Sequence, residues 1–190
     1  FGAFVRGVDM FDAWAFGGTS NNAAEAQAMD PQQRLILEGV ASAFGSSRFA
    51  QAAVVGVWVG IASSEYSSAV HHYSDRISAH TATGGSTSVA CGRVSYVYGL
   101  DGPSMAVDTA CSASLVSMHL ASGSLRNNEC SSGAACGVNL LLGCHGSMAT
   151  AAAGMLSADG RCKTLDSAAD GYVRGEACVV VQLLRSEGAA

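Results

Sequence analysis

The stretch "GPSMAVDTACSASLVSMHLASGSL", from Gly102 to Leu125, leads the chain from a strand through a cysteine into a helix. Ser104 to Val107 predict a short strand, and a polar turn and Cys111 follow it. Most residues after Cys111 are small, so the helix they predict packs close to its neighbours instead of filling a core by bulk. The stretch therefore predicts a thiol held at the junction of a strand and a helix.

Buried strands and helices alternate along the rest of the chain. Runs of apolar and β-branched residues without polar alternation predict strands covered on both faces. These strands are "AAVVGVWVGIA" (Ala52 to Ala62) and "GAACGVNLLLG" (133–143), and "CVVVQLLR" (178–185) predicts a further strand that closes the chain. The alternation predicts an α/β domain with a central sheet between layers of helices.

The helices carry their own start and stop signals. Asp30 as N-cap and Pro31 at the first helical position predict the start of a helix that runs to Phe44. Ser88 to Gly99 predicts a helix that ends at Gly99 as C-cap. The remaining segments predict a short helix over 148–156 and polar loops over 63–80 and 157–177.

Composition and charge exclude several classes of protein. The chain has 190 residues, of which 49% are hydrophobic and 13% charged, so most of it belongs to an interior or an interface. A net charge of -5 provides no basic surface, which argues against a nucleic-acid partner. The apolar runs are shorter than the roughly 20 residues that span a bilayer, so no membrane span is expected.

The seven cysteines predict free thiols. Their number is odd and they include no CxxC pair, which argues against a disulfide framework and against a zinc site. Reduced thiols are typical of a cytoplasmic or plastid-like compartment, and most of these cysteines are expected to be small buried hydrophobes.

Cys111 differs from the others because of its place at the start of a helix. The unpaired N–H groups and the dipole of a first helical turn favour an anion, so we expect a lowered thiol pKa there. The same turn can stabilise an oxyanion, with the backbone amide of Cys111 as a donor. Small neighbours such as Ala110 and Ser112 allow a substrate to approach the sulfur. The arrangement matches a nucleophile elbow with sulfur in place of oxygen, although spacing alone leaves a buried structural cysteine open.

The residues around Cys111 resemble the active-site signature of the β-ketoacyl synthases, the condensing enzymes of fatty-acid and polyketide assembly. The modular type I members carry a run very similar to Val107 through Leu115. Three further segments in the same order resemble this family, "VDMFDAWAFGGTSNNAAEAQAMDPQQRLILE", "VACGRVSYVYGLDGPS" and "GMLSADGRCKTLDSAADGYVRGEACVVVQLLR". Several motifs in the right order make the resemblance specific.

The resemblance implies a thiolase-like fold with a mixed central sheet, of which residues 1–190 would be most of the first half, the N-terminal domain, incomplete at both ends. It implies that Cys111 accepts an acyl group as a thioester, with its amide as an oxyanion donor. A malonyl-type extender is then decarboxylated and attacks the acyl group to give a β-ketoacyl product. The family's two catalytic histidines and its lysine belong to the second half, so we expect this chain to be inactive alone.

The resemblance also implies partners. The substrates would be acyl and malonyl thioesters carried on the phosphopantetheine of an acyl carrier protein, with no cofactor and no metal bound directly. The complete domain would form a homodimer in which the strand Ser104 to Val107 pairs with its twofold mate. An alternative function is a non-elongating ketosynthase-like scaffold that binds carrier proteins, and the presence of Cys111 argues against variants that have lost this residue.

Other chemistry-bearing residues have structural interpretations. His119 lies eight residues after Cys111, about 12 Å along a helix, and is expected to pack in the core rather than act as a base. Lys163 is expected in a loop salt bridge or as a solvated charge, Asp108 in a turn, and Arg34 and Glu38 as a helical pair. His71, His72, His80 and His145 are not expected to be catalytic either, and the segment around His145 departs from the usual family sequence.

Overall fold

A four-stranded mixed sheet forms the centre of the computed structural model, which describes residues 2–16, 22–48, 54–62, 64–71 and 77–186. The strands are β1 (Val55–Ile61), β2 (Ser104–Val107), β3 (Ser132–Asn139) and β4 (Ala177–Leu184). Their order is β2-β1-β3-β4, where the first three are parallel and β4 runs antiparallel to β3. The predicted strands are confirmed, although β3 ends at Asn139 and residues 140–143 are not part of it, and Ala52 and Ala53 lie outside the described residues.

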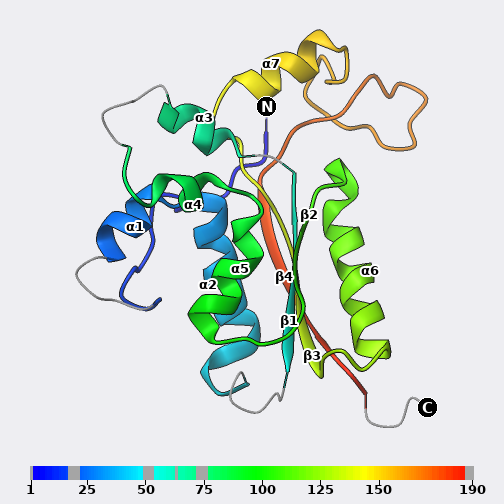
Figure 1. Cartoon of the computed structure of the whole chain (residues 1–190). Coiled ribbons are helices and arrows are strands. Elements are labelled where there is room, and N and C mark those ends of the chain that lie inside the picture. The colour runs from blue at the N-terminus through cyan, green and yellow to red at the C-terminus, as the bar shows by residue number, and fades with distance from the viewer. Residues whose placement is uncertain (1, 17–21, 49–53, 63, 72–76, 187–190) are drawn as a thin grey trace.

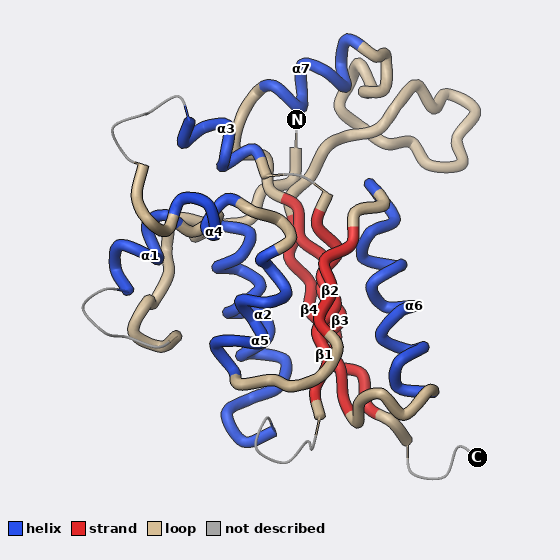
Figure 2. The backbone as a smooth tube through the Cα atoms, viewed as in Figure 1, coloured by secondary structure: helices blue, strands red, loops and turns tan. Residues whose placement is uncertain are grey.

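Helices cover both faces of this sheet (Figures 1 and 2). α2 (Pro31–Arg48) and α5 (Val89–Tyr98) lie on one face, and α6 (Ala113–Arg126) lies on the other. The smaller helices are α1 (Asn22–Ala28), α3 (Glu65–His71), α4 (Thr81–Gly85) and α7 (His145–Ala152). The α/β class predicted from the alternation is therefore confirmed. Within the described part of the chain, no helix is long and apolar enough to cross a membrane.

The start of α2 is fixed by the predicted N-cap, Asp30. Its carboxylate is buried and accepts the backbone N–H of Gln32 at 2.8 Å. The hydroxyl of Ser64 donates to the other carboxylate oxygen at 2.5 Å, which ties the segment after β1 to the start of the helix. Because an N-cap satisfies an amide that the helix leaves unpaired, Asp30 both begins α2 and holds it against the end of β1.

The end of α5 leads directly into β2. Gly99 has a left-handed φ of 62° and its amide bonds to the last turn of the helix, as a C-cap does. The N–H of Gly102 then donates to the carbonyl of Val55 at 3.1 Å, and the N–H of Val57 donates to the carbonyl of Pro103 at 2.8 Å. These bonds align β2 beside β1 before the stretch reaches Cys111.

The two faces of the sheet are packed by different means. Large aliphatic and aromatic residues of α2 fill the space against β3 and β4 on one face, among them Ile36, Leu37, Val40 and Phe44. On the other face the core is small and centres on Trp58, with Ala121 and Leu125 of α6 around it. Trp58 is the largest side chain of the core under α6.

Four glycines create that close packing under α6. Gly56 lies opposite Gly133 and Gly60 lies opposite Gly137 in the pairing of β1 with β3. A Cβ at Gly56 or Gly133 would overlap the ring of Trp58. A Cβ at Gly60 would lie 2.5 Å from the backbone carbon of Ala113, and one at Gly137 would lie 2.5 Å from the Cβ of Ser114.

Gly60 and Gly137 thus form a floor on which the first turn of α6 rests, and we refer to this pair as the glycine floor. Each overlap is far shorter than a normal contact between carbon atoms. The small residues that follow Cys111 in the sequence therefore allow the helix backbone to approach the sheet backbone.

The prediction of a loop over residues 63–80 is wrong for the part that forms α3. Ser64 begins this helix, since its hydroxyl accepts the N–H of Ser67 at 3.4 Å and the Ser67 hydroxyl donates to the carbonyl of Ser64 at 3.0 Å. Glu65 adds an acidic residue in the first turn. Local capping stabilises a short helix that has no apolar periodicity, which is why the sequence pattern did not predict it.

Candidate active site around Cys111

Cys111 lies in a tight turn between β2 and α6. A single 3₁₀ turn spans Ala110–Ser112 and α6 begins at Ala113, so the predicted strand-turn-cysteine-helix arrangement is confirmed. The side chain of Cys111 is exposed. The thiol is therefore presented to solvent at the N-terminal end of a 14-residue helix.

The residue before Cys111 has a strained backbone. Ala110 has a φ of 53°, which is in the left-handed region that residues with a Cβ rarely adopt. The carboxylate of Asp108 accepts the N–H of Ala110 at 2.9 Å and holds this conformation. Such outliers persist where the surrounding structure enforces them and they cluster at active sites. The turn role expected for Asp108 is confirmed, and the left-handed Ala110 is the elbow that lifts Cys111 above the sheet.

Hydrogen bonds on both sides of Cys111 complete this turn. The N–H of Ser112 donates to the carbonyl of Thr109 at 3.3 Å, and the N–H of Ala113 donates to the carbonyl of Ala110. The hydroxyl of Ser112 also donates to the carbonyl of Thr109 at 2.8 Å. The backbone around the thiol is therefore fixed by local bonds.

One buried hydroxyl anchors α6 to the sheet beneath it. Ser117 is fully buried, and its Oγ lies 3.0 Å from the carbonyl oxygen of Cys136 in β3 and 2.8 Å from that of Ser114. A buried hydroxyl that lost both acceptors would cost about 1–3 kcal/mol. This contact holds the second turn of α6 in place while the glycine floor supports the first.

A cavity of 480 Å³ opens beside Cys111. Its floor includes Gly60, Gly137 and the first turn of α6, and its far wall is the segment from Tyr172 to Gly175. The cavity lies at the end of the sheet where β1 and β3 finish, below α7 in Figure 1. Open α/β sheets bind ligands at the carboxyl ends of their parallel strands, so the position suits a substrate site.

Ionic contacts fix the far wall of this cavity. Nη1 of Arg174 donates to the hydroxyl of Ser147 at 2.9 Å and lies 3.7 Å from a carboxylate oxygen of Glu65. The other oxygen of Glu65 accepts the N–H of Gly143 at 2.8 Å. Arg174 is thereby tied to α3 and α7, and the wall that faces Cys111 is held from behind.

The match to known proteins agrees with this geometry. Residues 1–189 match the family described as "Beta-ketoacyl synthase, N-terminal domain". The chain belongs to the β-ketoacyl synthase family. Ketosynthases are also its neighbours among solved structures, so the predicted thiolase-like fold is confirmed.

The curated relatives are polyketide synthases that are much longer than this chain. The chain is 44% identical over 188 residues to a phenolphthiocerol/phthiocerol polyketide synthase of Mycobacterium tuberculosis, covering 97% of this chain and 12% of that protein. It is 45% identical over 179 residues to the polyketide synthase ThaG of Burkholderia thailandensis, covering 92% of this chain and 3% of that protein. The chain thus spans a small part of the curated relatives that it matches.

Solved ketosynthase domains are similar over nearly all of this chain. The oxazolomycin ketosynthase domain OzmH KS7 of Streptomyces albus has a TM-score of 0.85 at 33% identity, and the match covers 97% of this chain and 33% of that one. The ketosynthase from module 6 of the bacillaene synthase of Bacillus subtilis has a TM-score of 0.77 at 34% identity, over 95% of this chain and 31% of that one.

The described histidines of this ketosynthase chain do not line the cavity at Cys111. The prediction that His119 packs in the core is wrong, because its side chain is exposed. α6 buries the face that carries Ser117 and Ala121, and a residue two positions after Ser117 points about 200° around the helix. His145 is exposed at the start of α7 and His80 precedes α4. His72 lies outside the described residues, and none of the described histidines lines the cavity at Cys111.

Lys163 has the structural role expected from the sequence. Its Nζ lies 3.1 Å from Asp159 and 3.0 Å from Asp170 in the long loop before β4. A hydrogen bond with Ser157 and then the contact with Lys163 lower the pKa of both carboxyl groups. Lys163 therefore stabilises a loop conformation in which it and Leu165 have positive φ angles.

The expected pairing of Arg34 with Glu38 is only an electrostatic influence in this structure. Burial raises the pKa of Glu38, and the nearby charge of Arg34 lowers it by a smaller amount. Among the described residues no acidic group lies within ion-pair distance of Arg34. Partial burial, rather than a surface ion pair, thus sets the direction of the pKa shift of Glu38.

The seven cysteines divide into buried and exposed thiols, and all are free. Burial raises the pKa of Cys136 to about 12 and that of Cys178 to about 11, and it also raises the pKa of Cys130. Cys91 is buried as well, whereas Cys111, Cys144 and Cys162 are exposed. Within the described residues no cluster of His, Cys, Asp and Glu side chains could hold a metal ion.

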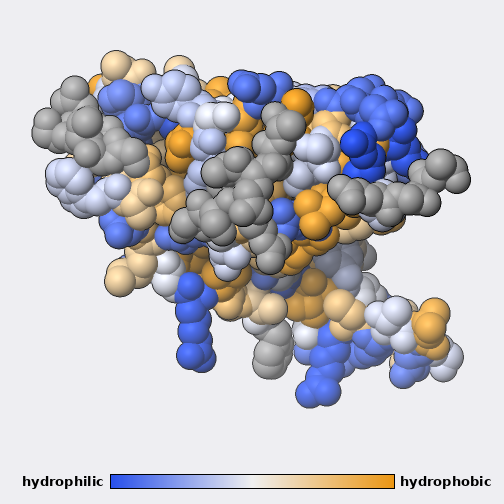
Figure 3. Space-filling model, turned by 90° about the horizontal axis from the view of Figure 1, so that it is seen from below, coloured by the Kyte–Doolittle hydropathy of each residue, from blue (hydrophilic) through white to orange (hydrophobic). Residues whose placement is uncertain are grey.

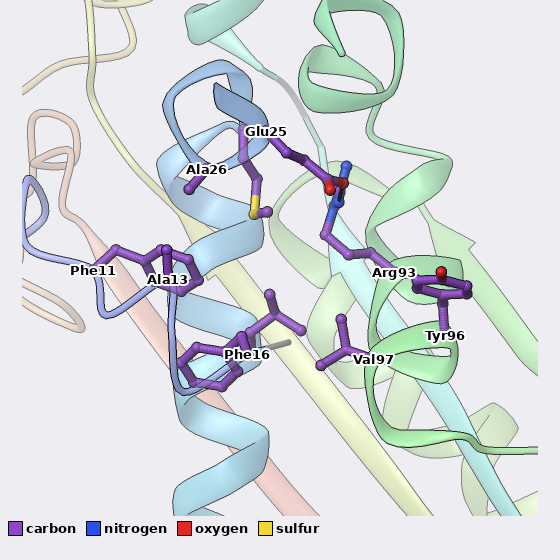
Figure 4. A pocket seen from close by; sticks show the side chains of 10 residues that line it. Phe11, Ala13, Phe16, Glu25, Ala26, Arg93, Tyr96 and Val97 are labelled. Atoms are coloured by element: carbon purple, nitrogen blue, oxygen red, sulfur yellow. Dashed lines mark hydrogen bonds and ion pairs between the residues drawn. The ribbon is translucent and has the colours of Figure 1, made fainter. Parts of the chain in front are cut away.

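A second cavity, of 420 Å³, lies away from Cys111, between the N-terminal segment, α1, α2 and α5 (Figure 4). Phe11 and Phe16 stack with ring centroids 5.1 Å apart, and Figure 4 shows Glu25 and Arg93 pointing toward each other. Arg93 forms an ion pair with Glu25 and its Nε donates to Gln33 at 2.7 Å. Its charge is already neutralised by protein groups, so Arg93 is not available to this cavity as an unpaired cation.

Figure 3 views the molecule from below and shows hydrophobic and hydrophilic residues interspersed among the described residues of that surface. Cys111 and its cavity lie at the opposite end of the sheet, where β1 and β3 finish.

Sequence reasoning placed Cys111 and its turn correctly but missed the groups that surround it. Tyr172, Val173 and Arg174 belong to a segment that the sequence predicted only as a loop, because no local signal shows which strand end a loop covers. The glycine floor had a usable signal. Gly56 and Gly60 in one strand have the same four-residue spacing as Gly133 and Gly137 in another, which indicates a close approach of backbone to one face of a sheet.

We expect Cys111 to be alkylated before Cys162 and before the four less exposed thiols when a limiting amount of iodoacetamide is added to the full-length protein at about pH 6. A helix N-terminus favours a thiolate, whereas burial raises the pKa of Cys136 to about 12 and that of the half-buried Cys178 to about 11. Peptide mass spectrometry ranks the sites. Cys162, which is exposed in a loop, is the internal control, because Cys144 is itself the N-cap of α7. Equal labelling of Cys111 and Cys162 would contradict the expectation.

Proposed function

We propose that the protein carrying this chain is a β-ketoacyl-[acyl-carrier-protein] synthase that performs decarboxylative Claisen condensation in polyketide or fatty-acid biosynthesis. The observation that carries the proposal is the exposed Cys111, placed by a strained turn at the N-terminus of α6 and facing a cavity of 480 Å³. The similarity to polyketide synthases supports the polyketide pathway over the fatty-acid pathway.

In the first step the thiolate of Cys111 attacks the carbonyl carbon of an acyl thioester. A C–S bond forms to Cys111, and the original C–S bond breaks and releases the carrier thiol. The negative charge on the carbonyl oxygen of the tetrahedral intermediate is stabilised by backbone N–H groups of the first turn, with the amide of Cys111 as one donor. The small residues at Ala110 and Ala113 leave room for this approach.

In the second step a malonyl-type thioester loses carbon dioxide and its α-carbon attacks the acyl group on Cys111. The new C–C bond forms as the C–S bond to Cys111 breaks, which restores the thiolate and releases a β-ketoacyl thioester. Residues that promote decarboxylation would have to come from outside the described cavity lining, since no histidine lies there. Both substrates would be carried on the phosphopantetheine of an acyl carrier protein, and we propose no cofactor or metal bound to this chain.

The carrier-protein partner, the compartment and the oligomeric state belong to the same proposal. The carrier protein must deliver its thioester to the end of the sheet at which Cys111 lies. The seven free thiols fit a reducing compartment such as the cytoplasm. We also propose a homodimer formed through β2, which is an edge strand whose Ser104 and Met105 are exposed.

Replacement of Cys111 by alanine is expected to abolish formation of the acyl-enzyme, because no other described cysteine lines the cavity. Formation of the acyl-enzyme is measured by incubating the full-length protein with a radiolabelled acyl thioester and separating it by denaturing electrophoresis. Cys144→Ala is the matched control, since it removes an exposed thiol outside the cavity and should load normally. Normal loading in Cys111→Ala would refute the assignment. Loading without any β-ketoacyl product in the unaltered protein would favour the non-elongating scaffold.

Light scattering of the full-length protein is expected to give the mass of a dimer. An edge strand of four residues can extend the sheet only by pairing with another strand, and its twofold mate supplies one in the antiparallel sense. A monomer across the micromolar range would count against pairing through β2.

A further inference from the structure

We propose that Gly60 and Gly137 are positioning residues for Cys111, and that they act by setting how deeply the first turn of α6 lies on the sheet. The inference rests on the proposed function, because it concerns the reactivity of that same thiol. Both glycines lie on the face of the sheet under α6 and directly opposite each other in neighbouring strands. Cys111 lies two residues before Ala113 and three before Ser114, the two residues that contact the glycine floor.

The two contacts differ in a way that an experiment can use. At Gly137 an added Cβ would meet only the side chain and Cα of Ser114, with Cβ at 2.5 Å, Oγ at 3.4 Å and Cα at 3.5 Å. At Gly60 it would meet backbone atoms, the carbon of Ala113 at 2.5 Å, the nitrogen of Ser114 at 2.6 Å and the oxygen of Ala113 at 2.7 Å. The overlap at Gly137 can thus be relieved by trimming Ser114, and the overlap at Gly60 cannot.

A displacement of the first turn of α6 away from the sheet would move Cys111 rather than spread along the whole helix. Ser117 is anchored to the carbonyl of Cys136 and Ala121 is fully buried, so the middle of α6 stays in place. Ala110 is held in its left-handed conformation by Asp108, so the other side of the turn is fixed as well. The residues between these anchors, with Cys111 among them, take up the displacement.

The size of the displacement makes the effect measurable. Normal contact between two carbon atoms is about 3.5–4.0 Å, so an overlap at 2.5 Å requires a shift of roughly 1 Å. A misplacement of about 1 Å at a reacting group costs on the order of 100-fold in rate. Gly137→Ala should therefore lower the rate of acyl transfer to Cys111 about 100-fold in the full-length protein.

The matched variants separate positioning from a general loss of stability. Gly137→Ala combined with Ser114→Gly removes the overlap and leaves a nearest distance of 3.5 Å, so its rate should return to within about 10-fold of Ser114→Gly alone. Ser114→Gly should not rescue Gly60→Ala. Gly133→Ala overlaps the ring of Trp58 in the same strand pair and destabilises the core, but it lies away from the first turn of α6 and should leave the rate of the folded protein near its original value.

The measurement is single-turnover transfer from an N-acetylcysteamine acyl thioester, together with the pH profile of iodoacetamide alkylation at Cys111 and urea unfolding of each variant. An unchanged rate in Gly137→Ala, an equal loss in Gly133→Ala, or the absence of rescue in a folded double variant would each overturn the inference. Should Gly137→Ala fail to fold, Ser114→Thr is used instead. It is expected to crowd the contact between residue 114 and Gly137 less severely and to lower the rate of acyl transfer by about 10-fold.

Failure of the proposed function gives a different result. If the unaltered protein takes up no acyl group, the proposed condensation is wrong. The alkylation profiles of the same variants still test the positioning of Cys111, because that reaction needs no carrier protein and no acyl substrate. A pH profile of alkylation that is the same in Gly137→Ala and in the unaltered protein would then reject the positioning role of the glycine floor.

Discussion

The contact between the first turn of α6 and the glycine floor is the constraint on which the rest of this structure depends. Gly60 and Gly137 bring sheet backbone and helix backbone together where Cβ atoms would overlap. Trp58 fills the space under the middle of the helix, over Gly56 and Gly133, where there are no side chains to compete with its ring. On this face β1 and β3 therefore combine one large side chain, Trp58, with four glycines, and the small residues after Cys111 allow α6 to pack against them.

This close approach places the thiol at a chemically useful point. The chain leaves β2, passes the left-handed Ala110 and enters α6, so Cys111 is raised at the carboxyl end of the parallel strands. The N-terminal end of the dipole of α6 lies at the same point. On the other side of the cavity, the contacts of Arg174 with Glu65 and Ser147 hold the wall in place. The site is built from backbone geometry and one exposed thiol rather than from a cluster of ionisable groups.

Much of the fold could be predicted from the sequence because its signals are local. Asp30 and Gly99 mark a helix start and a helix end through hydrogen bonds within a few residues, and both act as predicted. The two buried strands, β1 and β3, and the closing strand β4 were also predicted, since apolar runs of that length have few alternatives. Where local signals were weak, the prediction failed, as for α3, which depends on the cap at Ser64, and for His119, whose side of α6 was not assigned.

The site could be predicted only in part, for a physical reason. The cysteine and its turn lie in one continuous stretch, and the resemblance to ketosynthases identified them. The wall from Tyr172 to Gly175 reaches Cys111 through tertiary contacts of a long loop, and a loop's destination is not encoded in its own residues. The φ of Ala110 is likewise imposed by Asp108 and by the packing of α6, since alanine by itself disfavours that conformation.

We propose that Cys111 is the group that carries the acyl chain. The most direct test is to incubate the full-length protein with an acyl thioester, digest it without reducing agent at mildly acidic pH and locate the added mass by peptide sequencing. We expect one acyl group per chain in this segment, on the peptide that contains Cys111. An acyl group on Cys144, Cys162 or any other residue of this segment, with Cys111 unmodified, would contradict it.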